Sequence, residues 1–481
     1  MALRYKSLLE FLLTFFMASF LMGCGGEGDS QTDKAGETQT AIKEVKNLTL
    51  FVHGFDKEGY QAEGVFGDEH PDDALEKFQE LGDYPVANNT KIINLIKATT
   101  YYGDESPKYY TAQDMQDLKR VTEQWGGGIP RYALIVAKYA KYLMKQEKVD
   151  RINIVSGSMG SLVTRWMIEK DVEGLASQQQ IAKWYSLEGV IIGNYAADRI
   201  EYIEQFYGSN ALDSIDIEHM SSDWISDNLS NSTGEASSPF YKHILLGQQA
   251  STDDDLNSGL LTKLLFLNGQ FSANDGTQRV KDCRFDSITD NVRYNNLPPT
   301  FTLIHKNHLS IKDHMGAWAN VMTFLNTNKR VTLTLVDAKV EDIQESIAWH
   351  NKKAEIIFAS NVYSPKIEED WGITEAITEN TREGATLAVH SYIEEGEEKV
   401  LNQFVLDQLV AANETHLNIQ FQVEEIDNDA KYGVYETYQK DYDLIDMTEV
   451  KVPLKDGVYG YSGEHWSFHV KVKINTYPTN E

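Results

Sequence analysis

The stretch that decides the fold reads Ile154-Val155-Ser156-Gly157-Ser158-Met159-Gly160-Ser161-Leu162-Val163-Thr164-Arg165. It begins inside a short apolar run, Arg151–Ser156, which predicts a buried β-strand. It continues into Gly160–Lys170, whose pattern predicts a helix. The small residues around Ser158 allow the strand and the helix to approach each other closely. The stretch therefore predicts a sharp strand–turn–helix unit with Ser158 at its corner.

The surrounding sequence repeats this alternation of strands and helices. An amphipathic helical pattern begins near Pro130, and a second covers Lys312–Asn326. Alternating strands and helices are typical of a mostly parallel α/β sheet. Further apolar runs that predict strands are Asn47–His53, Lys91–Lys97, Leu187–Ile192, His243–Gly247 and Thr300–Ile304.

The turn around Ser158 resembles the nucleophile elbow of the α/β-hydrolases, most closely the lipase form with Met after the serine. In that elbow a tight turn lifts the serine hydroxyl above the sheet. Gly160 keeps the second glycine of G-x-S-x-G, and Ser156 replaces the first. The resemblance implies that Ser158 is a nucleophile. The alternative is an ordinary Gly/Ser-rich turn that ends a buried strand.

A second motif, Phe51-Val52-His53-Gly54-Phe55, ends the first predicted strand. The His53-Gly54 pair resembles the oxyanion-hole turn of lipases. Acyl transfer builds negative charge on the carbonyl oxygen, and aimed backbone N–H groups stabilise that charge. The resemblance implies that these donors are the amides of Phe55 and Met159.

A nucleophilic serine needs a histidine base and a carboxylate that orients it. In this fold the chain order is serine, acid, histidine. Asn274-Asp275-Gly276 and Asn307-His308-Leu309 resemble the acid and base segments of the true lipases of Gram-negative bacteria. The resemblance implies Asp275 as the acid and His308 as the base.

Other residues compete for both roles. His305 and His314 flank His308, and Asn-Asp-Gly is also an ordinary turn sequence. The alternative acids, which follow the His243–Gly247 strand directly, are Asp253, Asp254 and Asp255.

The sequence also departs from the true-lipase pattern. That family carries a calcium ligand two residues after its histidine, and this chain has Ser310 there. We therefore expect neither a metal nor a cofactor. The GPI inositol deacylases share this style of elbow, so the subfamily stays open. Residues 196–240 form an insertion that could be a lid over the site or an ordinary helical excursion packed on the sheet.

After residue 330 the pattern changes to β-rich alternation, which predicts an acidic β-sandwich over 331–481. This region has 12 basic and 29 acidic residues, a net charge of −17. Val400–Val410 is the one segment in it that could be helical. Glu424–Asp429 is similar to calcium-binding loops of lipid-binding sandwiches, but a solvated acidic loop is the favoured interpretation.

The N-terminus has the layout of an export signal. Arg4 and Lys6 precede the apolar run Ser7–Met22, which is short for a membrane-spanning helix. The run ends in Leu-Met-Gly-Cys24, which resembles the lipobox of bacterial lipoproteins. The resemblance implies a signal peptide over 1–23, an acylated Cys24 that carries chains such as palmitate, and an outer-membrane address. The composition of 24–46 is that of a flexible tether.

Composition narrows the function classes. The 481 residues carry a net charge of −29, which repels a phosphate backbone, so we expect no nucleic-acid partner. Two cysteines, Cys24 and Cys283, exclude a disulfide scaffold.

Taken together, these patterns predict a membrane-anchored serine lipase or esterase with an α/β-hydrolase domain over 47–328. The alternatives are an acyltransferase or lipid deacylase with the same triad, and an inactive hydrolase-fold scaffold lipoprotein.

Overall fold

The fold is described from a computed structural model of the chain. The described residues are 43–55, 64–69, 73–81, 90–199, 215–229, 240–251, 274–285, 299–304, 306–341, 353–363, 378–379, 389–427 and 441–477. The predicted signal peptide, Cys24 and most of the predicted tether lie outside them. Among the described residues, no helix combines the length and the apolar character needed to cross a membrane.

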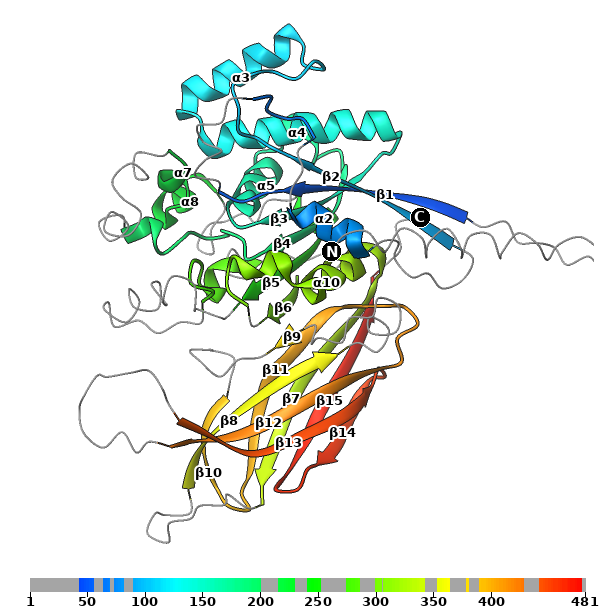
Figure 1. The fold of residues 1–481 in the computed structure, drawn as a ribbon, viewed down its shortest axis with the longest axis vertical. Helices are drawn as coiled ribbons and strands as arrows, with labels where there is room; N and C mark the ends of the chain where they lie inside the picture. The colour runs from blue at the N-terminus through cyan, green and yellow to red at the C-terminus, as the bar shows by residue number, and fades with distance from the viewer. Residues whose placement is uncertain are drawn as a thin grey trace, which may run out of the picture. The chain divides into compact units, whose positions relative to one another are not determined.

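Six parallel strands form the first part of a large sheet (Figure 1). Their order is β6-β5-β4-β3-β1-β2, so β1 lies between β2 and β3. The chain moves outward from β1 to β2 and then crosses to the other side of β1. Ligand sites of open α/β sheets lie at such a reversal, beyond the carboxyl ends of the strands. The strands are β1 (Lys43–Val52), β2 (Thr90–Thr99), β3 (Ile152–Gly157), β4 (Ile181–Leu187), β5 (Leu245–Ser251) and β6 (Thr300–Ile304).

Helices cover both faces of the parallel strands, because successive strand residues point to opposite faces. Leu50 and Val52 pack in the core beneath α4 and α5, whereas Phe51 packs with α2 and α10. The helices that form these layers are α2 (Asp73–Leu81), α3 (Ala112–Trp125), α4 (Gly128–Glu147), α5 (Met159–Glu169) and α10 (Met315–Asn326).

The sheet continues beyond β6 into the C-terminal part of the chain. β11 pairs with β6 at Asp407 and Phe301, and antiparallel pairing extends the sheet to ten strands, β14-β15-β7-β11-β6-β5-β4-β3-β1-β2. The sequence pattern changes near residue 330, but the sheet is continuous across this position because β11 pairs with β6. The added strands are β7 (Lys329–Val340), β11 (Glu398–Val410), β14 (Gly457–Ser462) and β15 (Trp466–Thr476).

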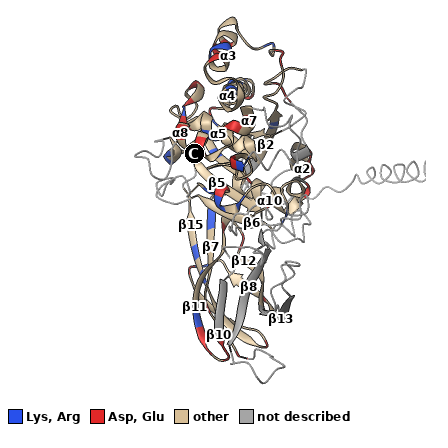
Figure 2. Ribbon diagram, turned by 90° about the vertical axis from the view of Figure 1, so that its left-hand side faces the viewer, with Lys and Arg blue, Asp and Glu red and all other residues tan. Residues whose placement is uncertain are grey.

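A second, antiparallel sheet has the order β10-β8-β12-β13, and β9 pairs with β8. Buried residues of β12 and β13 share one core with those of β7, β11 and β15, which makes a β-sandwich. Figure 2 shows basic residues along β7 and β15, so the described strands do not all share the acidic character of this region. The strands of the second sheet are β8 (Lys353–Tyr363), β9 (Thr378–Glu379), β10 (Val389–Glu394), β12 (His416–Asp427) and β13 (Asp441–Pro453).

The predicted fold class, an α/β-hydrolase core followed by a C-terminal β-sandwich, is confirmed. Two local predictions are wrong. Val400–Val410 is not a helix, because it lies in β11 and pairs with β7. Leu187–Ile192 is not a strand, because β4 ends at Leu187 and residues 188–192 form a buried loop.

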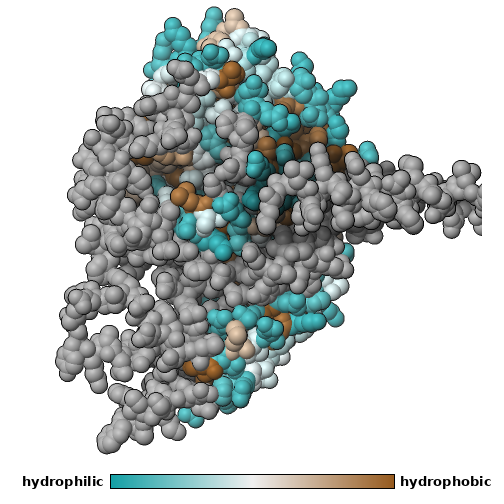
Figure 3. Space-filling model, viewed as in Figure 1, coloured by the Kyte–Doolittle hydropathy of each residue, from teal (hydrophilic) through white to brown (hydrophobic). Residues whose placement is uncertain are grey.

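On the face drawn in Figure 3, hydrophobic residues are interspersed with hydrophilic ones over the described surface. Large exposed apolar side chains of the described residues are few, and Leu309 is one of them at 58% exposure. Leu309 follows His308 directly, so one exposed apolar side chain adjoins that histidine in the chain.

Candidate active site

Ser158 stands at a strained corner between β3 and α5. Its backbone has φ 48° and ψ −124°, which an L-residue rarely adopts. The corner fits only because Gly160 has no side chain: a Cβ there would lie 2.3 Å from the His53 carbonyl oxygen. Ser156, which replaces the first glycine of the motif, is fully buried, and its hydroxyl accepts a hydrogen bond from Trp184 Nε1 at 2.7 Å. The elbow therefore tolerates serine at that position.

The loop after β4 holds the corner in place. The Ser158 N–H donates to the Leu187 carbonyl at 2.9 Å, and the Val190 N–H donates to the Ser158 carbonyl at 3.0 Å. Gly189 packs against Ser161, where a Cβ would approach to 2.5 Å. The apolar run in 188–192 that resembles a strand in the sequence is thus a buried support for the elbow.

The His53-Gly54 turn lies directly beside Ser158. A Cβ at Gly54 would meet the Ser158 Cβ at 2.9 Å, so only glycine allows this approach. The Tyr101 hydroxyl lies 2.8 Å from the carbonyl oxygens of both His53 and Gly54, and the Tyr101 ring stacks on His53 at 4.2 Å. These contacts fix the turn that carries the Phe55 amide.

Met159 is the first residue of α5, so its N–H belongs to the helix end that has no intrahelical acceptor. The two amides that the sequence predicts as oxyanion donors, Phe55 and Met159, therefore flank Ser158 from two different elements, the turn after β1 and the start of α5.

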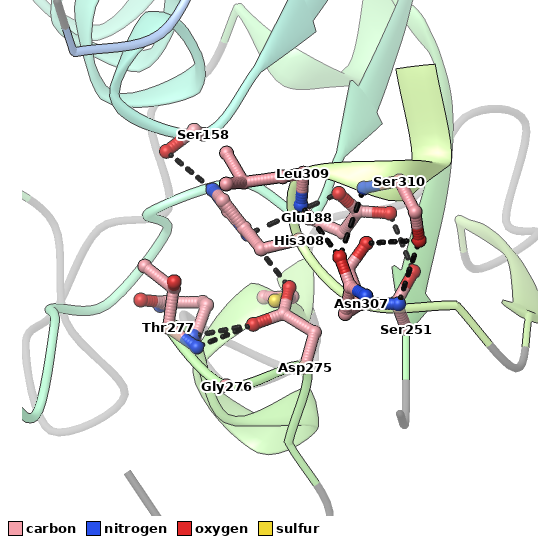
Figure 4. Close-up of polar contacts among 12 residues, drawn as sticks. Ser158, Glu188, Ser251, Asp275, Gly276, Thr277, Asn307, His308, Leu309 and Ser310 are labelled. Atoms are coloured by element: carbon pink, nitrogen blue, oxygen red, sulfur yellow. Dashed lines mark hydrogen bonds and ion pairs between the residues drawn. The ribbon is translucent and has the colours of Figure 1, made fainter. Parts of the chain in front are cut away.

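Ser158, His308 and Asp275 form a hydrogen-bonded chain (Figure 4). His308 Nε2 lies 3.0 Å from Ser158 Oγ, and His308 Nδ1 lies 2.7 Å from Asp275 Oδ2. A proton on Nδ1 leaves Nε2 to accept the serine hydroxyl, which is the arrangement a general base requires. Residues that are 117 and 150 positions from Ser158 in sequence thus converge on its hydroxyl.

Asp275 is fixed by its own turn. Its Oδ1 accepts the N–H groups of Thr277 at 2.9 Å and Gln278 at 2.6 Å, while Oδ2 faces the histidine. The His308 N–H donates to the Asp275 carbonyl at 3.0 Å, so main chain and side chain join the same two residues. Asp275 is 1% exposed.

The loop that carries His308 is held by Asn307, whose side-chain oxygen accepts the N–H groups of Leu309 and Ser310. The competing His314 has another role, because its Nδ1 caps α10 by accepting the Ala317 N–H at 3.2 Å. His305 and the competing acids Asp253, Asp254 and Asp255 lie outside the described residues.

The charge of the site favours a protonated His308. Burial alone would lower the pKa of His308, but the charge of Asp275, its hydrogen bond and the charge of Glu188 outweigh burial and raise that pKa to about 9. The Asp275 carboxylate therefore stabilises the imidazolium form strongly.

No motif in the sequence points to Glu188. It is 2% exposed, and its Oε2 lies 3.9 Å from His308 Nδ1. The available signal was its position: the residue that follows a parallel strand stands at the carboxyl edge of the sheet, where sites form. The apolar residues that follow Glu188 make the sequence resemble a longer strand, so the end of β4 is not visible in it.

Glu188, Asp275 and His308 also form the cluster of possible metal ligands in the described part of the chain. Both ring nitrogens of His308 are already hydrogen-bonded, Nε2 to Ser158 and Nδ1 to Asp275. Cys283 is buried nearby, and burial raises the pKa of its thiol well above the usual range, which makes it unreactive.

Part of the predicted lid segment 196–240 is described. It contains α7 (Ile215–His219) and α8 (Ser222–Asn228). The Asp216 carboxylate accepts hydrogen bonds at 3.3 Å from Tyr102 and Tyr132, which pack beside Tyr101 and His53. This segment is therefore attached to the aromatic layer behind the His53-Gly54 turn.

Comparison with known proteins gave only distant likenesses. No family model matches the chain, and no curated protein matches it. The mature form of the Bacillus licheniformis lipase BlEst2 shares 13% identity over 55% of this chain and 86% of that chain, with a TM-score of 0.33. Its propeptide form shares 10% identity over 88% and 96% of the two chains, with a TM-score of 0.35. The metagenomic carboxyl esterase MGS0156 shares 16% identity over 60% and 71%, with a TM-score of 0.30.

These likenesses are too distant to carry an argument about activity. The class of protein follows from the chain itself: an α/β-hydrolase fold whose elbow serine is hydrogen-bonded to a histidine, which is in turn hydrogen-bonded to an aspartate.

Proposed function

We propose that this protein is a serine carboxylic-ester hydrolase of the lipase or esterase type, with Ser158, His308 and Asp275 as its catalytic triad. The observation that carries the proposal is the hydrogen-bonded chain from Ser158 Oγ through His308 to Asp275, set at a strained elbow. Strain in an L-residue persists only where the surroundings enforce it, and such residues cluster at active sites.

In the first step Ser158 Oγ attacks the carbonyl carbon of the ester while its proton moves to His308 Nε2. The carbonyl oxygen becomes an oxyanion, which accepts hydrogen bonds from the amides of Phe55 and Met159. The intermediate collapses, the carbon–oxygen bond to the alcohol breaks, and the alcohol leaves with the proton from His308. The acyl group stays bonded to Ser158.

In the second step water attacks the acyl-enzyme. His308 Nε2 takes a proton from the water, and the carbon–oxygen bond to Ser158 breaks as Ser158 regains a proton from His308. The products are a carboxylic acid and the free enzyme. Throughout both steps Asp275 stabilises the imidazolium form of His308 and keeps Nδ1 as the donor.

Substitution of the nucleophile tests the proposal. Ser158→Ala should lower kcat for p-nitrophenyl esters on the order of 10⁶-fold, as loss of the serine does in other triad enzymes. Circular dichroism and thermal unfolding should show an intact fold. A fluorophosphonate probe should label the wild type and the control Ser177→Ala, whose serine is exposed, but not Ser158→Ala. Equal labelling of Ser158→Ala would refute the assignment.

We also propose that Cys24 carries the lipid anchor that holds the enzyme at the outer membrane. The support is the Leu-Met-Gly-Cys24 motif after a short apolar run. Cells fed an alkyne-tagged palmitate should label the wild type and not Cys24→Ala, and only the variant should be released from washed membranes. Labelling of Cys24→Ala would contradict this proposal without affecting the catalytic one.

The substrate that we propose is an ester of a lipid or of a similar apolar acid. The exposed Leu309 beside His308 supports an apolar approach to the site. A series of esters of increasing acyl length, with phospholipids included, should show kcat/KM rising with chain length. A maximum at acetate would favour a short-chain esterase instead.

A further inference from the structure

A second carboxyl group, Glu188, is built into the wall behind His308. It follows β4 with a backbone φ of 47°. Its N–H donates to the Gln249 carbonyl at 2.9 Å, and its Oε1 accepts the Ser251 hydroxyl at 2.5 Å. Both of these contacts tie Glu188 to β5. Hydrogen bonds therefore hold both the main chain and the side chain of Glu188.

The second carboxyl oxygen of Glu188, Oε2, points to the atom that Asp275 already binds. His308 Nδ1 lies 2.7 Å from Asp275 Oδ2 and 3.9 Å from Glu188 Oε2. Figure 4 shows the two carboxyl groups reaching the same edge of the imidazole from different loops. One N–H therefore faces two acceptors, of which only one is at hydrogen-bond distance.

The charges around Glu188 explain why Asp275 holds the bond. Burial, together with the charge of Asp275, raises the pKa of Glu188 to about 8, although His308 acts in the opposite direction. The other titratable groups that interact with Glu188 in the described residues are Cys283 and Tyr185. Since two adjacent buried carboxyl groups cannot both ionise at low cost, Glu188 keeps its proton at neutral pH.

We propose that Glu188 is a second positioning residue for His308: when the Asp275 carboxylate is absent, the Glu188 carboxylate accepts the hydrogen bond from His308 Nδ1. This inference rests on the proposed function. Burial remains when Asp275 is removed, but the charge of Asp275 no longer raises the pKa of Glu188 and the charge of His308 still lowers it, so Glu188 ionises more readily beside the imidazolium. Closing the gap from 3.9 Å to a hydrogen bond takes a shift of about 1 Å between Glu188 Oε2 and His308 Nδ1.

Five variants, two of them double, test the proposal by kcat/KM. Asp275→Ala is preferred over Asp275→Asn, because an amide would donate to Nδ1 and impose the wrong tautomer. Loss of the triad acid costs about 10⁴-fold where nothing replaces it. We expect Asp275→Ala to cost only about 100-fold here, and Asp275→Ala with Glu188→Gln to cost about 10⁴-fold.

The control is a second buried carboxyl of the same domain. Glu169 has a side chain that is 4% exposed and is paired with Arg165, away from His308. Asp275→Ala with Glu169→Gln should therefore keep the kcat/KM of Asp275→Ala. If the Glu188→Gln double variant matches Asp275→Ala within threefold, Glu188 does not position His308 and the proposal is overturned.

Glu188→Gln alone gives a readout that a structural role would not move. Glu188 is charged above its pKa of about 8, and this charge is one cause of the raised pKa of His308, so Glu188→Gln should shift the acid limb of the kcat/KM profile to lower pH. Glu169→Gln should leave that limb in place. An unshifted limb in Glu188→Gln contradicts the proposal.

A spectroscopic measurement separates this inference from the proposed function. The hydrogen-bonded Nδ1 proton of His308 gives a low-field NMR resonance that can be observed without any turnover. The resonance should persist in Asp275→Ala and vanish when Glu188→Gln is added. Persistence in the double variant overturns the role of Glu188, whereas an intact resonance in a wild type that hydrolyses no ester overturns the function alone.

Discussion

The parallel and antiparallel parts of the ten-stranded sheet use different sequence patterns. β5 and β6 are buried at every position, whereas β14 and most of β15 alternate between more and less buried residues. A strand that is covered on both faces has no solvated side for polar groups. In the parallel part the reactive groups therefore collect beyond the carboxyl ends of the strands.

Backbone strain follows the same division. Ser158 and Glu188 have positive φ angles, and each follows directly on a parallel strand. In the described residues after 330, Asn402 is the non-glycine residue with a positive φ, at a register shift in β11. The comparison teaches that the parallel part places two residues with positive φ beside its site, while the antiparallel part absorbs its irregularities in register shifts between strands.

The largest expected effect comes from breaking the seam between the two parts. Arg330 is 2% exposed and binds both carboxylate oxygens of Asp407, the Tyr477 hydroxyl and the Pro299 carbonyl. Arg330→Met leaves the partly buried Asp407 without its bidentate partner, which should lower the free energy of unfolding by about 3 kcal/mol. Urea unfolding measures this change.

A second substitution serves as the control for the seam. Asp407→Leu in the Arg330→Met background removes the unpaired charge and should recover part of the loss. If Arg330→Met unfolds like the wild type, the two parts of the sheet do not depend on this pair.

The second prediction compares the same substitution in both parts. Gly160→Ala places a Cβ 2.3 Å from a backbone oxygen, so the elbow must move. A displacement of about 1 Å in the site costs roughly 100-fold in kcat/KM. Gly460→Ala, on β14, meets only the His469 side chain at 3.1 Å and should leave hydrolysis within twofold. Equal losses of kcat/KM in both variants would contradict the inference that the site depends on the parallel part of the sheet.

The pH dependence of hydrolysis should follow the loss of the proton from His308. Its pKa is raised to about 9, and the base must be neutral to accept the serine proton. We therefore expect kcat/KM to rise about tenfold for each pH unit below 9 and to level off above it. Initial rates on a soluble ester between pH 6 and pH 10 measure this profile. A plateau that begins near pH 6.5 would show that Asp275 and Glu188 do not raise the pKa of His308.

The smallest predicted effect compares two tyrosine hydroxyls. Tyr101→Phe removes the donor that holds the His53-Gly54 turn, and one such bond is worth about 1 kcal/mol. We expect kcat to fall about fivefold with a small loss of stability. Tyr461→Phe removes a bond to the Lys451 carbonyl in the sandwich and should cost similar stability without changing kcat. A fall in kcat for Tyr461→Phe would mean that the sandwich affects the site.

Local patterns predicted much of the fold. Thr300–Ile304 was predicted as a strand with the bounds of β6, and the elbow follows β3 as predicted. These segments are predictable because a strand covered on both faces is an unbroken apolar run, and because a tight turn admits only small residues. The strand at Val400–Val410 was not recognised because two register shifts interrupt its alternation, so its period is no longer two.

For the site, the sequence suggested Ser158, Asp275 and His308 through short motifs in the order of a known family, and their catalytic roles stay a prediction. Glu188 could not be found this way. Its importance comes from a distance to His308, and its neighbours in sequence are apolar. Glu188 and His308 are 120 positions apart, so no local sequence pattern indicates that Glu188 approaches His308 Nδ1.

By itself, the sequence determined the class of fold and the residue types at the elbow, because burial on two faces and close approach restrict composition locally. Only the tertiary structure decided that β11 joins β6 and makes one continuous sheet, and that Glu188 stands behind the histidine. Both are long-range events: strand pairing is set by which edges are left open, and the pKa of a carboxyl is set by the charges that folding brings around it.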